Sequence, residues 1–203
     1  MDWDARVVGL VGSHYDTKYY PNIRFVGAND GGSSTGILLE MARVLRDRPE
    51  LTALLELIFF DGEEAFEHFS ATDGLYGSRH YAKTITRRQS RSQQPSFVVI
   101  LDLLGEKSLN VGLPSDTPSH LREHLFSAAD DLGYASYFGV YPTPIIDDHV
   151  PFQQLGIPAM DIIDLDYRAW HTSRDTLSQI SKKSLAISGQ TSLLLLEKYL
   201  LTP

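Results

Sequence analysis

The sequence contains no cysteine, which excludes disulfide bonds and thiolate metal ligands. No apolar run reaches the roughly 20 residues of a membrane-spanning helix, and the N-terminus, MDWDARVVGL, lacks the charged and apolar regions of a signal peptide. Basic residues are also scarce: 18 Lys and Arg stand against 26 Asp and Glu, a net charge of −8. Because no basic cluster offsets this charge, we expect neither nucleic acid nor an anionic membrane as a partner. Any metal must be held by Asp, Glu and His.

The composition and the apolar pattern indicate a single α/β domain over residues 1–203. A hydrophobic fraction of 42% and a charged fraction of 22% are ordinary for a globular chain. Near-continuous apolar runs predict strands, and segments of helical period alternate with them, which favours a mostly parallel sheet in a three-layer α/β/α sandwich. The predicted strands are Arg6–Gly12, Leu54–Phe60, Phe97–Leu101 and Ala159–Leu165; the clearest predicted helices lie near 37–45 and 184–201, and 87–95 is a polar loop.

Polar side chains are found at or just after the predicted carboxyl ends of these strands. In open α/β sheets ligands bind outside the carboxyl ends, so side chains scattered along the chain are expected to converge there. Clusters of Asp, Glu and His without Cys suit a catalytic zinc site, in which three protein ligands leave one position open. The candidates are His14, Asp16, Asp30, Glu63, Glu64, Asp102 and His171.

The adjacent glutamates Glu63 and Glu64 follow a buried strand directly. Two neighbouring carboxylates repel each other and are costly to bury, so a cation or solvent must compensate them. A solvated helix start is the simpler alternative, because acidic residues favour the first turn of a helix. If a metal is present, one glutamate would ligate it and the other would stay free to carry a proton. Asp102, inside the apolar run VVILDLLG, needs a partner in either case.

The order of these motifs resembles the zinc-dependent exopeptidase family that includes bacterial leucyl aminopeptidases and glutaminyl cyclases. The order is His-x-Asp at 14–16, Gly-Ala-Asn-Asp at 27–30, Glu-Glu at 63–64, Leu-Asp at 101–102 and Trp-His-Thr at 170–172, and it covers nearly the whole chain. The stretches FFDGEEAF (59–66), LYGSRH (75–80), DDHVPF (147–152) and WHT look more like the glutaminyl-peptide cyclotransferase branch than the aminopeptidase branch.

The resemblance implies a role for each matching residue. It implies one zinc ion held by Asp30, Glu64 and His171, with Glu63 as the general acid/base. Asp102 and Asp147 would form a carboxylate network beside Glu63, and Trp170 would line the substrate pocket; Asp148 is read equally well as a helix cap. The implied reaction is an acyl transfer that converts the N-terminal glutamine of a peptide or protein to pyroglutamate and releases ammonia.

Three departures from the family pattern keep alternatives open. Phe69 and Ile146 stand where glutaminyl cyclases commonly have tryptophan and glutamine in the substrate site, and GANDGGSSTG (27–36) is closer to the aminopeptidase form. His14 and Asp102 would complete a second zinc site bridged by Asp30, as a di-zinc aminopeptidase requires. A catalytically silent interaction domain is the third alternative, but it would be expected to have lost ligands, and none is lost.

The family's usual N-terminal helices are not visible here, because the chain begins almost at its first predicted strand. The catalytic domain is therefore expected to lack that extension. The compartment, the oligomeric state and the preferred peptide stay open; export would depend on a segment that this sequence does not show.

Overall fold

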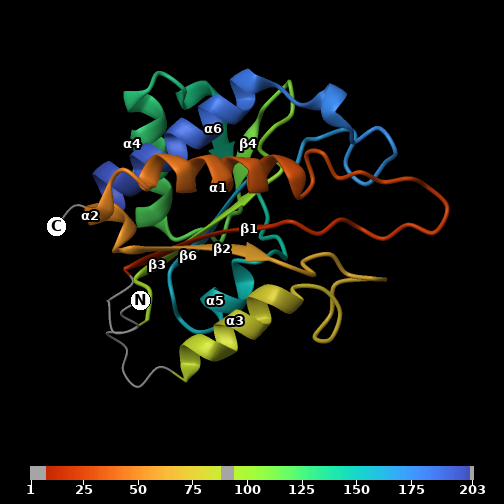
Figure 1. Ribbon diagram of the computed structural model, residues 1–203, viewed down its shortest axis with the longest axis horizontal. Helices are drawn as coiled ribbons and strands as arrows, with labels where there is room; N and C mark the ends of the chain where they lie inside the picture. Colours follow the sequence, from red (N-terminus) through yellow and green to blue (C-terminus); the bar gives the residue numbers. More distant parts are fainter. Residues whose placement is uncertain (1–7, 88–93, 202–203) are drawn as a thin grey trace.

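The computed structural model describes residues 8–87 and 94–201, and a four-stranded parallel sheet lies at its centre (Figure 1). Its strand order is β2-β1-β3-β6, and each neighbouring pair is parallel. All four strands therefore end at the same edge of the sheet. The strands are β1 (Gly9–His14), β2 (Leu55–Phe60), β3 (Phe97–Asp102) and β6 (Ala159–Ile163).

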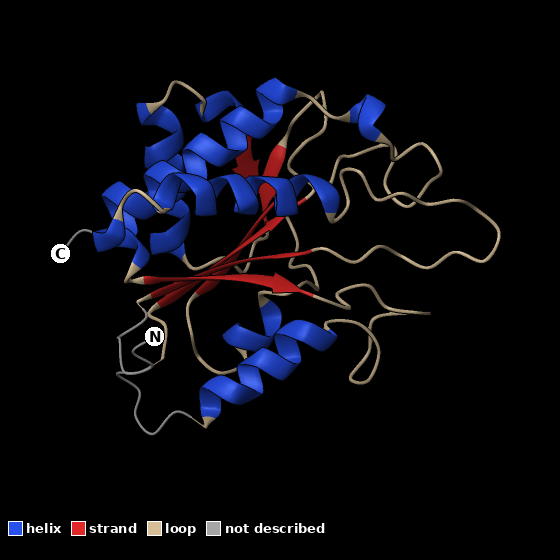
Figure 2. Ribbon diagram, viewed as in Figure 1, coloured by secondary structure: helices blue, strands red, loops and turns tan. Residues whose placement is uncertain are grey.

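Helices cover both faces of this sheet, which gives three layers (Figures 1 and 2). One face packs against α1 (Gly32–Leu45), α4 (Ser119–Asp131) and α6 (Lys182–Leu194), and the other against α3 (Tyr76–Thr86) and α5 (Val150–Gln153). The α/β/α sandwich expected from the sequence is thereby confirmed. Among the described residues no helix has the length and apolar character needed to cross a bilayer.

The two apolar layers follow from the two-residue period of β3. Val99 and Leu101 pack into the cluster under α1, α4 and α6, whereas Val98 and Ile100 belong to the cluster with α3 and α5. Successive side chains of a strand point to opposite faces, so a strand buried on both faces must be apolar throughout. Each fully buried aliphatic side chain contributes about 1.5–3 kcal/mol. The strand ends are therefore held on a rigid base.

Element boundaries differ from the prediction at several places, among them β6, which ends at Ile163 and not at Leu165. β1 begins and ends later than the predicted strand 6–12, so His14 is its last residue and does not follow it, while residues 6 and 7 lie outside the described residues. The helix predicted at 184–201 ends as α6 at Leu194 and continues as a π-helical turn (Leu195–Leu200). Most of the polar segment predicted as a loop, 88–93, also lies outside the described residues.

Several short elements were not predicted. A small parallel pair, β4 with β5, lies beside β6, and short helical turns connect the larger elements. Their bounds are α2 (Pro49–Thr52), β4 (Val111–Leu113), the 3₁₀ turn Ala135–Tyr137, β5 (Phe138–Val140) and the 3₁₀ turn Leu177–Gln179.

Candidate active site

The sheet brings the predicted ligands to the carboxyl ends of its strands, as expected. His14 and Asp102 end β1 and β3. Glu64 follows β2, His171 follows β6, and Asp30 lies in the turn before α1. That turn requires glycine at position 31, whose φ is +84° and where an added Cβ would lie 2.6 Å from the carbonyl oxygen of Asp16.

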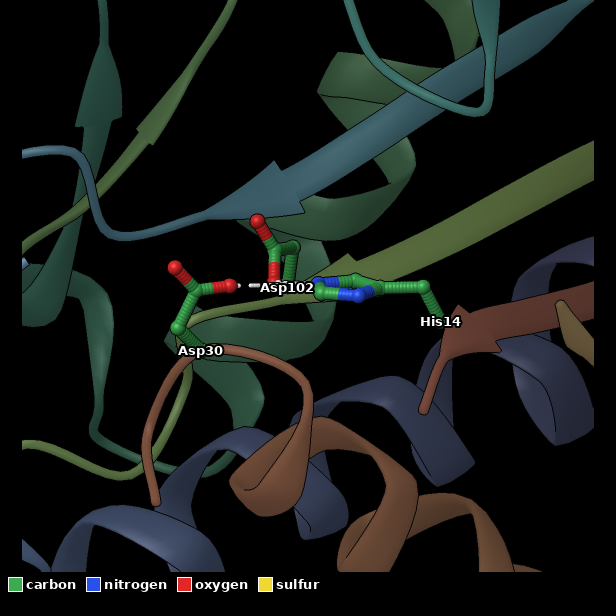
Figure 3. Close-up of side chains that lie close together, drawn as sticks. All are labelled: His14, Asp30 and Asp102. Atoms are coloured by element: carbon green, nitrogen blue, oxygen red, sulfur yellow. Dashed lines mark hydrogen bonds and ion pairs between the residues drawn. The ribbon is translucent and has the colours of Figure 1, made fainter. Parts of the chain in front are cut away.

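Asp30 lies between two histidines, and each of its carboxylate oxygens faces one of them. His14 Nε2 is 3.4 Å from Asp30 Oδ1, and His171 Nε2 is 3.3 Å from Asp30 Oδ2. His14 also contacts Asp102 Oδ1 at 3.1 Å, and His171 contacts Glu64 Oε1 at 3.1 Å. Figure 3 shows the imidazole of His14 and the carboxylates of Asp30 and Asp102 pointing toward one another.

Two groups of three possible metal ligands therefore share Asp30. They are Asp30, Glu64 and His171, and His14, Asp30 and Asp102; within each group the ligand atoms lie within 4.8 Å of one another. Imidazole and carboxylate groups in threes are the ligand set of catalytic zinc sites. Asp30 Oδ2 is buried and accepts no hydrogen bond from the described part of the chain. The residues thus fit a zinc ion, and they offer positions for one ion or two.

The histidines and Asp30 stabilise each other's charged forms. Burial alone would lower the pKa of His14, but the hydrogen bond to Asp102 and its charge outweigh burial and raise the pKa well above its usual value. Burial alone would also lower the pKa of His171, but its interactions with the carboxylates of Asp30 and Glu64 outweigh burial and raise the pKa to about 9. The pKa of Asp30 falls to about 2, because the two histidines outweigh its burial.

Glu63 faces the same centre without joining either group of ligands. Glu63 is 7% exposed, and its pKa is raised well above the usual value, first by burial and then by the charge of Asp147. A carboxyl with a raised pKa can hold a proton at neutral pH and release it during a reaction. The roles predicted for Glu63 and Asp147 stay predictions; among the described contacts Asp102 bonds to His14, and Asp147 accepts the backbone N–H of Asp148.

Three buried polar residues behind Asp147 were not given a functional role by the sequence analysis. Asp161 lies inside β6, and burial followed by the charge of Asp147 raises its pKa well above normal. His149 Nδ1 is 3.9 Å from Asp161 Oδ2, and burial lowers the pKa of His149 to about 4. Asp148 is fully buried and does not cap α5, whose N-cap residue is His149. Asp161 could have been identified from the sequence, because it interrupts the apolar stretch AMDII in the same way that Asp102 interrupts its own apolar run.

Asp16 holds the backbone of the paired glutamates. Its carboxylate accepts the N–H of Glu63 at 3.1 Å and that of Glu64 at 3.2 Å, and its Oδ1 is 3.5 Å from His14 Nδ1. Asp16 thus links the histidine that ends β1 to the loop that follows β2. Lys18, also missed by the sequence analysis, lies 3.8 Å from Glu64 Oε2 and donates to the carbonyl oxygen of Ala65.

A cavity of about 330 Å³ opens onto these groups. Its wall includes the three predicted substrate-contacting residues, Phe69, Ile146 and Trp170, together with Glu63 and His171. Trp170 is 48% exposed, and its indole stacks on the His171 imidazole, with ring centroids 4.1 Å apart. The cavity therefore has an aromatic and aliphatic rim above an acidic base.

Two further rings surround His171. Tyr20 and Phe25 contact the imidazole edge-to-face, with centroids 5.8 and 5.9 Å away. These contacts fix the orientation of a residue whose own backbone is left-handed, with a φ of 54°. Neither ring was singled out from the sequence.

Comparisons with known proteins relate the sequence and the fold of this chain to one family. The model of peptidase family M28 matches residues 3–196. The glutaminyl-peptide cyclotransferase of Boiga dendrophila is 34% identical over 87% of this chain and 57% of its own length. An Acidobacteriales bacterium glutaminyl cyclase structure is 36% identical, with a TM-score of 0.88 over 96% of this chain and 70% of that one. A zinc-dependent exopeptidase from Parabacteroides distasonis is 27% identical, with a TM-score of 0.81 over 98% and 75%.

The first curated relatives are longer than this chain, which spans about 57% of their length. Within that span, the similarities confirm the resemblance to glutaminyl cyclases and zinc-dependent exopeptidases seen in the motifs. The chain belongs to peptidase family M28.

Proposed function

We propose that this chain is the catalytic part of a glutaminyl-peptide cyclotransferase, which converts an N-terminal glutamine to pyroglutamate. The observation that carries the proposal is the position of Glu63. It faces the cavity beside both ligand groups, belongs to neither, and has a raised pKa. A general acid/base needs all three properties. The relatives named glutaminyl-peptide cyclotransferase support the same reaction.

In this proposal Asp30, Glu64 and His171 hold one zinc ion. When bound, the zinc would act as a Lewis acid toward the side-chain carboxamide of the substrate glutamine. All three proposed ligands line the cavity, so a zinc ion that they hold would be accessible to a substrate bound there.

Glu63 would move the proton that the reaction requires. The α-amine of the substrate attacks its own γ-carboxamide carbon, so that a C–N bond forms, a five-membered lactam closes and ammonia leaves. Glu63 takes a proton from the attacking amine and delivers it to the departing nitrogen, and it ends the cycle unchanged. The nucleophile belongs to the substrate, so the cavity need only hold amine and carboxamide close together.

The rim of the cavity would provide that positioning. Trp170 stacks on His171 and presents a flat apolar wall, while Phe69 and Ile146 lie on the same cavity. An enclosed side chain loses water and rotational freedom before reaction, which favours ring closure. Peptide and protein N-termini are therefore the proposed substrates.

A comparison of two substrates tests the proposal. A glutamine-initiated dipeptide should release ammonia and acquire a blocked N-terminus, detected by a coupled ammonia assay and mass spectrometry. A leucine-initiated chromogenic amide should remain almost untouched. Glu63→Gln protein is the matched control, because it removes the acid/base with little change in size. Free leucine from the second substrate, without ammonia from the first, would overturn the cyclase proposal.

A metallo-aminopeptidase is the second candidate. It is favoured by the presence of Asp30 in both groups of possible metal ligands. His14 and Asp102 complete a second group of ligands on Asp30, as a two-metal hydrolase requires. Glu63 would then accept a proton from the attacking water. Metal analysis separates the candidates: one zinc per chain supports the cyclase, and two zinc ions together with leucine release support the aminopeptidase.

A further inference from the structure

The side chain of Asp175 holds the backbone on which Asp30 is mounted. Asp175 is fully buried, and its Oδ1 accepts the N–H of Asn29 at 2.8 Å while its Oδ2 accepts the N–H of Asp30 at 3.1 Å. Each carboxylate oxygen therefore accepts the N–H of one of two consecutive residues. This pattern differs from a helix cap, because the two donors lie 145 and 146 residues away in the sequence.

Tyr167 fixes the carboxylate from the other side. Its hydroxyl donates to Asp175 Oδ1 at 2.7 Å. Burial, followed by this hydrogen bond, raises the pKa of Tyr167, so the hydroxyl stays protonated and remains a donor. Three donors thus converge on one carboxylate, and hydrogen bonds to a charged acceptor are the stronger kind.

Asp175 lies close in sequence to His171, so its hydrogen bonds to Asn29 and Asp30 connect two parts of the proposed metal site. Asp175 follows His171 by four residues, and its own N–H donates to the carbonyl oxygen of Thr172 at 3.0 Å. One carboxylate therefore ties the segment that carries His171 to the turn that carries Asp30. The Asn29 side chain also holds this turn to the end of β3, through the carbonyl of Leu103 and the N–H of Gly105, but Asp175 is the residue that links it to the segment carrying His171.

We propose that Asp175 is a positioning residue for the metal site. By holding two successive N–H groups it sets the direction of the Asp30 side chain, so that one oxygen faces His14 and the other faces His171. Without it, two buried N–H groups would lose their partners and the turn would relax away from His171. Partners that orient ligands typically change metal affinity 10- to 100-fold when they are removed. The inference rests on the zinc site of the proposed function, but not on the reaction performed there.

Zinc affinity measured on metal-free protein tests the proposal directly. A chromophoric chelator competes for zinc with wild-type protein and with Asp175→Ala and Asp175→Asn. We expect Asp175→Ala to weaken zinc binding about 10- to 100-fold. Asp175→Asn should fall between it and the wild type, because the amide keeps only one acceptor oxygen. Tyr167→Phe should show the smallest loss, since it removes one donor and leaves both N–H contacts.

Asp164 supplies a matched control. It is also fully buried, and its carboxylate accepts the N–H groups of Asn110 at 2.8 Å and Asp166 at 3.2 Å. Asp164→Asn disturbs the same kind of contact at a place that holds no proposed ligand. It should lower thermal stability while zinc affinity stays within about 2-fold of the wild type. Equal losses of affinity in Asp164→Asn and Asp175→Asn would reduce Asp175 to a general structural role and overturn the proposal.

The absorption spectrum of the cobalt-substituted protein provides a second readout that does not depend on activity. Its visible bands report ligand geometry, so Asp175→Asn should shift them and Asp164→Asn should not. If Asp175→Ala fails to fold, the Asp175→Asn and Tyr167→Phe proteins still test the proposal. Wild-type zinc affinity and unshifted cobalt bands in both variants would overturn it. A wild-type protein that binds zinc tightly but does not cyclise glutamine would refute the proposed function alone.

Discussion

Two groups of buried acids lie next to each other at the strand ends, and they differ in the cations that face them. Asp30 is 3% exposed and lies between two histidines, and its pKa falls to about 2. Asp148 is fully buried near other carboxyls, and its pKa rises to about 7. Burial is nearly equal, so the neighbours decide the protonation state. We call these the histidine side (Asp30, Glu64, His171, His14 and Asp102) and the carboxyl side (Glu63, Asp147, Asp148 and Asp161).

This difference assigns two kinds of chemistry to one cavity. A metal ion needs deprotonated oxygen ligands, and Asp30 on the histidine side provides one at every pH above about 2. Proton transfer needs a carboxyl whose pKa is raised toward neutral pH, so that it can both accept and release a proton, and on the carboxyl side the pKa of Glu63 is raised in this way. His149 does not alter the contrast, because burial lowers its pKa to about 4 and leaves the ring uncharged.

The largest effect should come from removing a ligand on the histidine side. His171→Ala should weaken zinc binding by more than about 100-fold, since even partners outside the coordination shell contribute 10- to 100-fold. Elemental analysis after dialysis against a weak chelator measures the retained zinc. His120→Ala, an exposed histidine on α4, is the control and should keep full occupancy. Full occupancy in His171→Ala would show that the ligand assignment is wrong.

Removing the acid/base on the carboxyl side should leave the metal in place. Glu63→Gln should retain zinc and fold but lose about 10²-fold or more in turnover, because general acid/base groups contribute that much. Steady-state kinetics and zinc analysis on the same sample give both readouts. Glu64→Gln should instead lose zinc. The reverse pattern in the two variants would exchange their roles and would contradict the division between the two sides.

The carboxyl side should also appear in the pH dependence of stability. The usual pKa of Asp148 is 3.8 and its folded value is about 7, so between these pH values the folded state holds a proton that the unfolded state has lost. Its contribution to stability is therefore present at acid pH and is lost as the pH rises toward 7. Asp148→Asn should flatten this decline by at least about 1 kcal/mol.

Chemical denaturation of the metal-free protein from pH 4 to pH 7 measures the decline. Asp130→Asn, at an exposed position on α4, is the control and should follow the wild-type curve. A wild-type stability that rises over this range, with no difference in Asp148→Asn, would mean that Asp148 is ionised in the folded state.

The smallest effect is expected at the rim, which belongs to neither side. Trp170→Ala removes the stacking on His171 and part of the cavity wall, and aromatic pairs of this kind contribute about 0.5–1.5 kcal/mol. A contact of the same size between the indole and the substrate would be lost as well, so KM should rise by about 2- to 10-fold with kcat nearly unchanged. Phe66→Ala, another exposed aromatic, should not alter KM. A fall in kcat without a change in KM would move Trp170 from substrate binding to metal positioning.

The apolar pattern of the sequence predicted the scaffold and the convergence of polar side chains at the strand ends, whereas the choice of Asp30, Glu64 and His171 as zinc ligands came from the resemblance to the family. Apolar runs such as FVVILD identify buried strands, and the residues that end them must meet at one edge of a parallel sheet. The predicted positions of His14, Asp30, Asp102 and His171 follow from this rule, and the structure brings these side chains together.

Residues that act through distant backbone contacts could not be found in this way. Asp175 lies in a loop where aspartate commonly forms turns, and only the folded chain reveals its bonds to Asn29 and Asp30. Asp161 was detectable in principle, since it interrupts an apolar strand as Asp102 does. The difference in pKa between Asp30 and Asp148 also depends on tertiary neighbours and has no counterpart in the sequence.

The sharing of Asp30 by two histidines has a consequence for folding. His14 ends the first strand and His171 follows the last, so the ligands come together only when the order β2-β1-β3-β6 is complete. Contacts between such distant segments form slowly, because a long loop must close first. Zinc that binds only the finished sheet would stabilise it by about 2.7 kcal/mol when its free concentration is 100 times its dissociation constant. The fraction of folded protein would then depend on the free zinc concentration, and a chelator would remove this stabilisation.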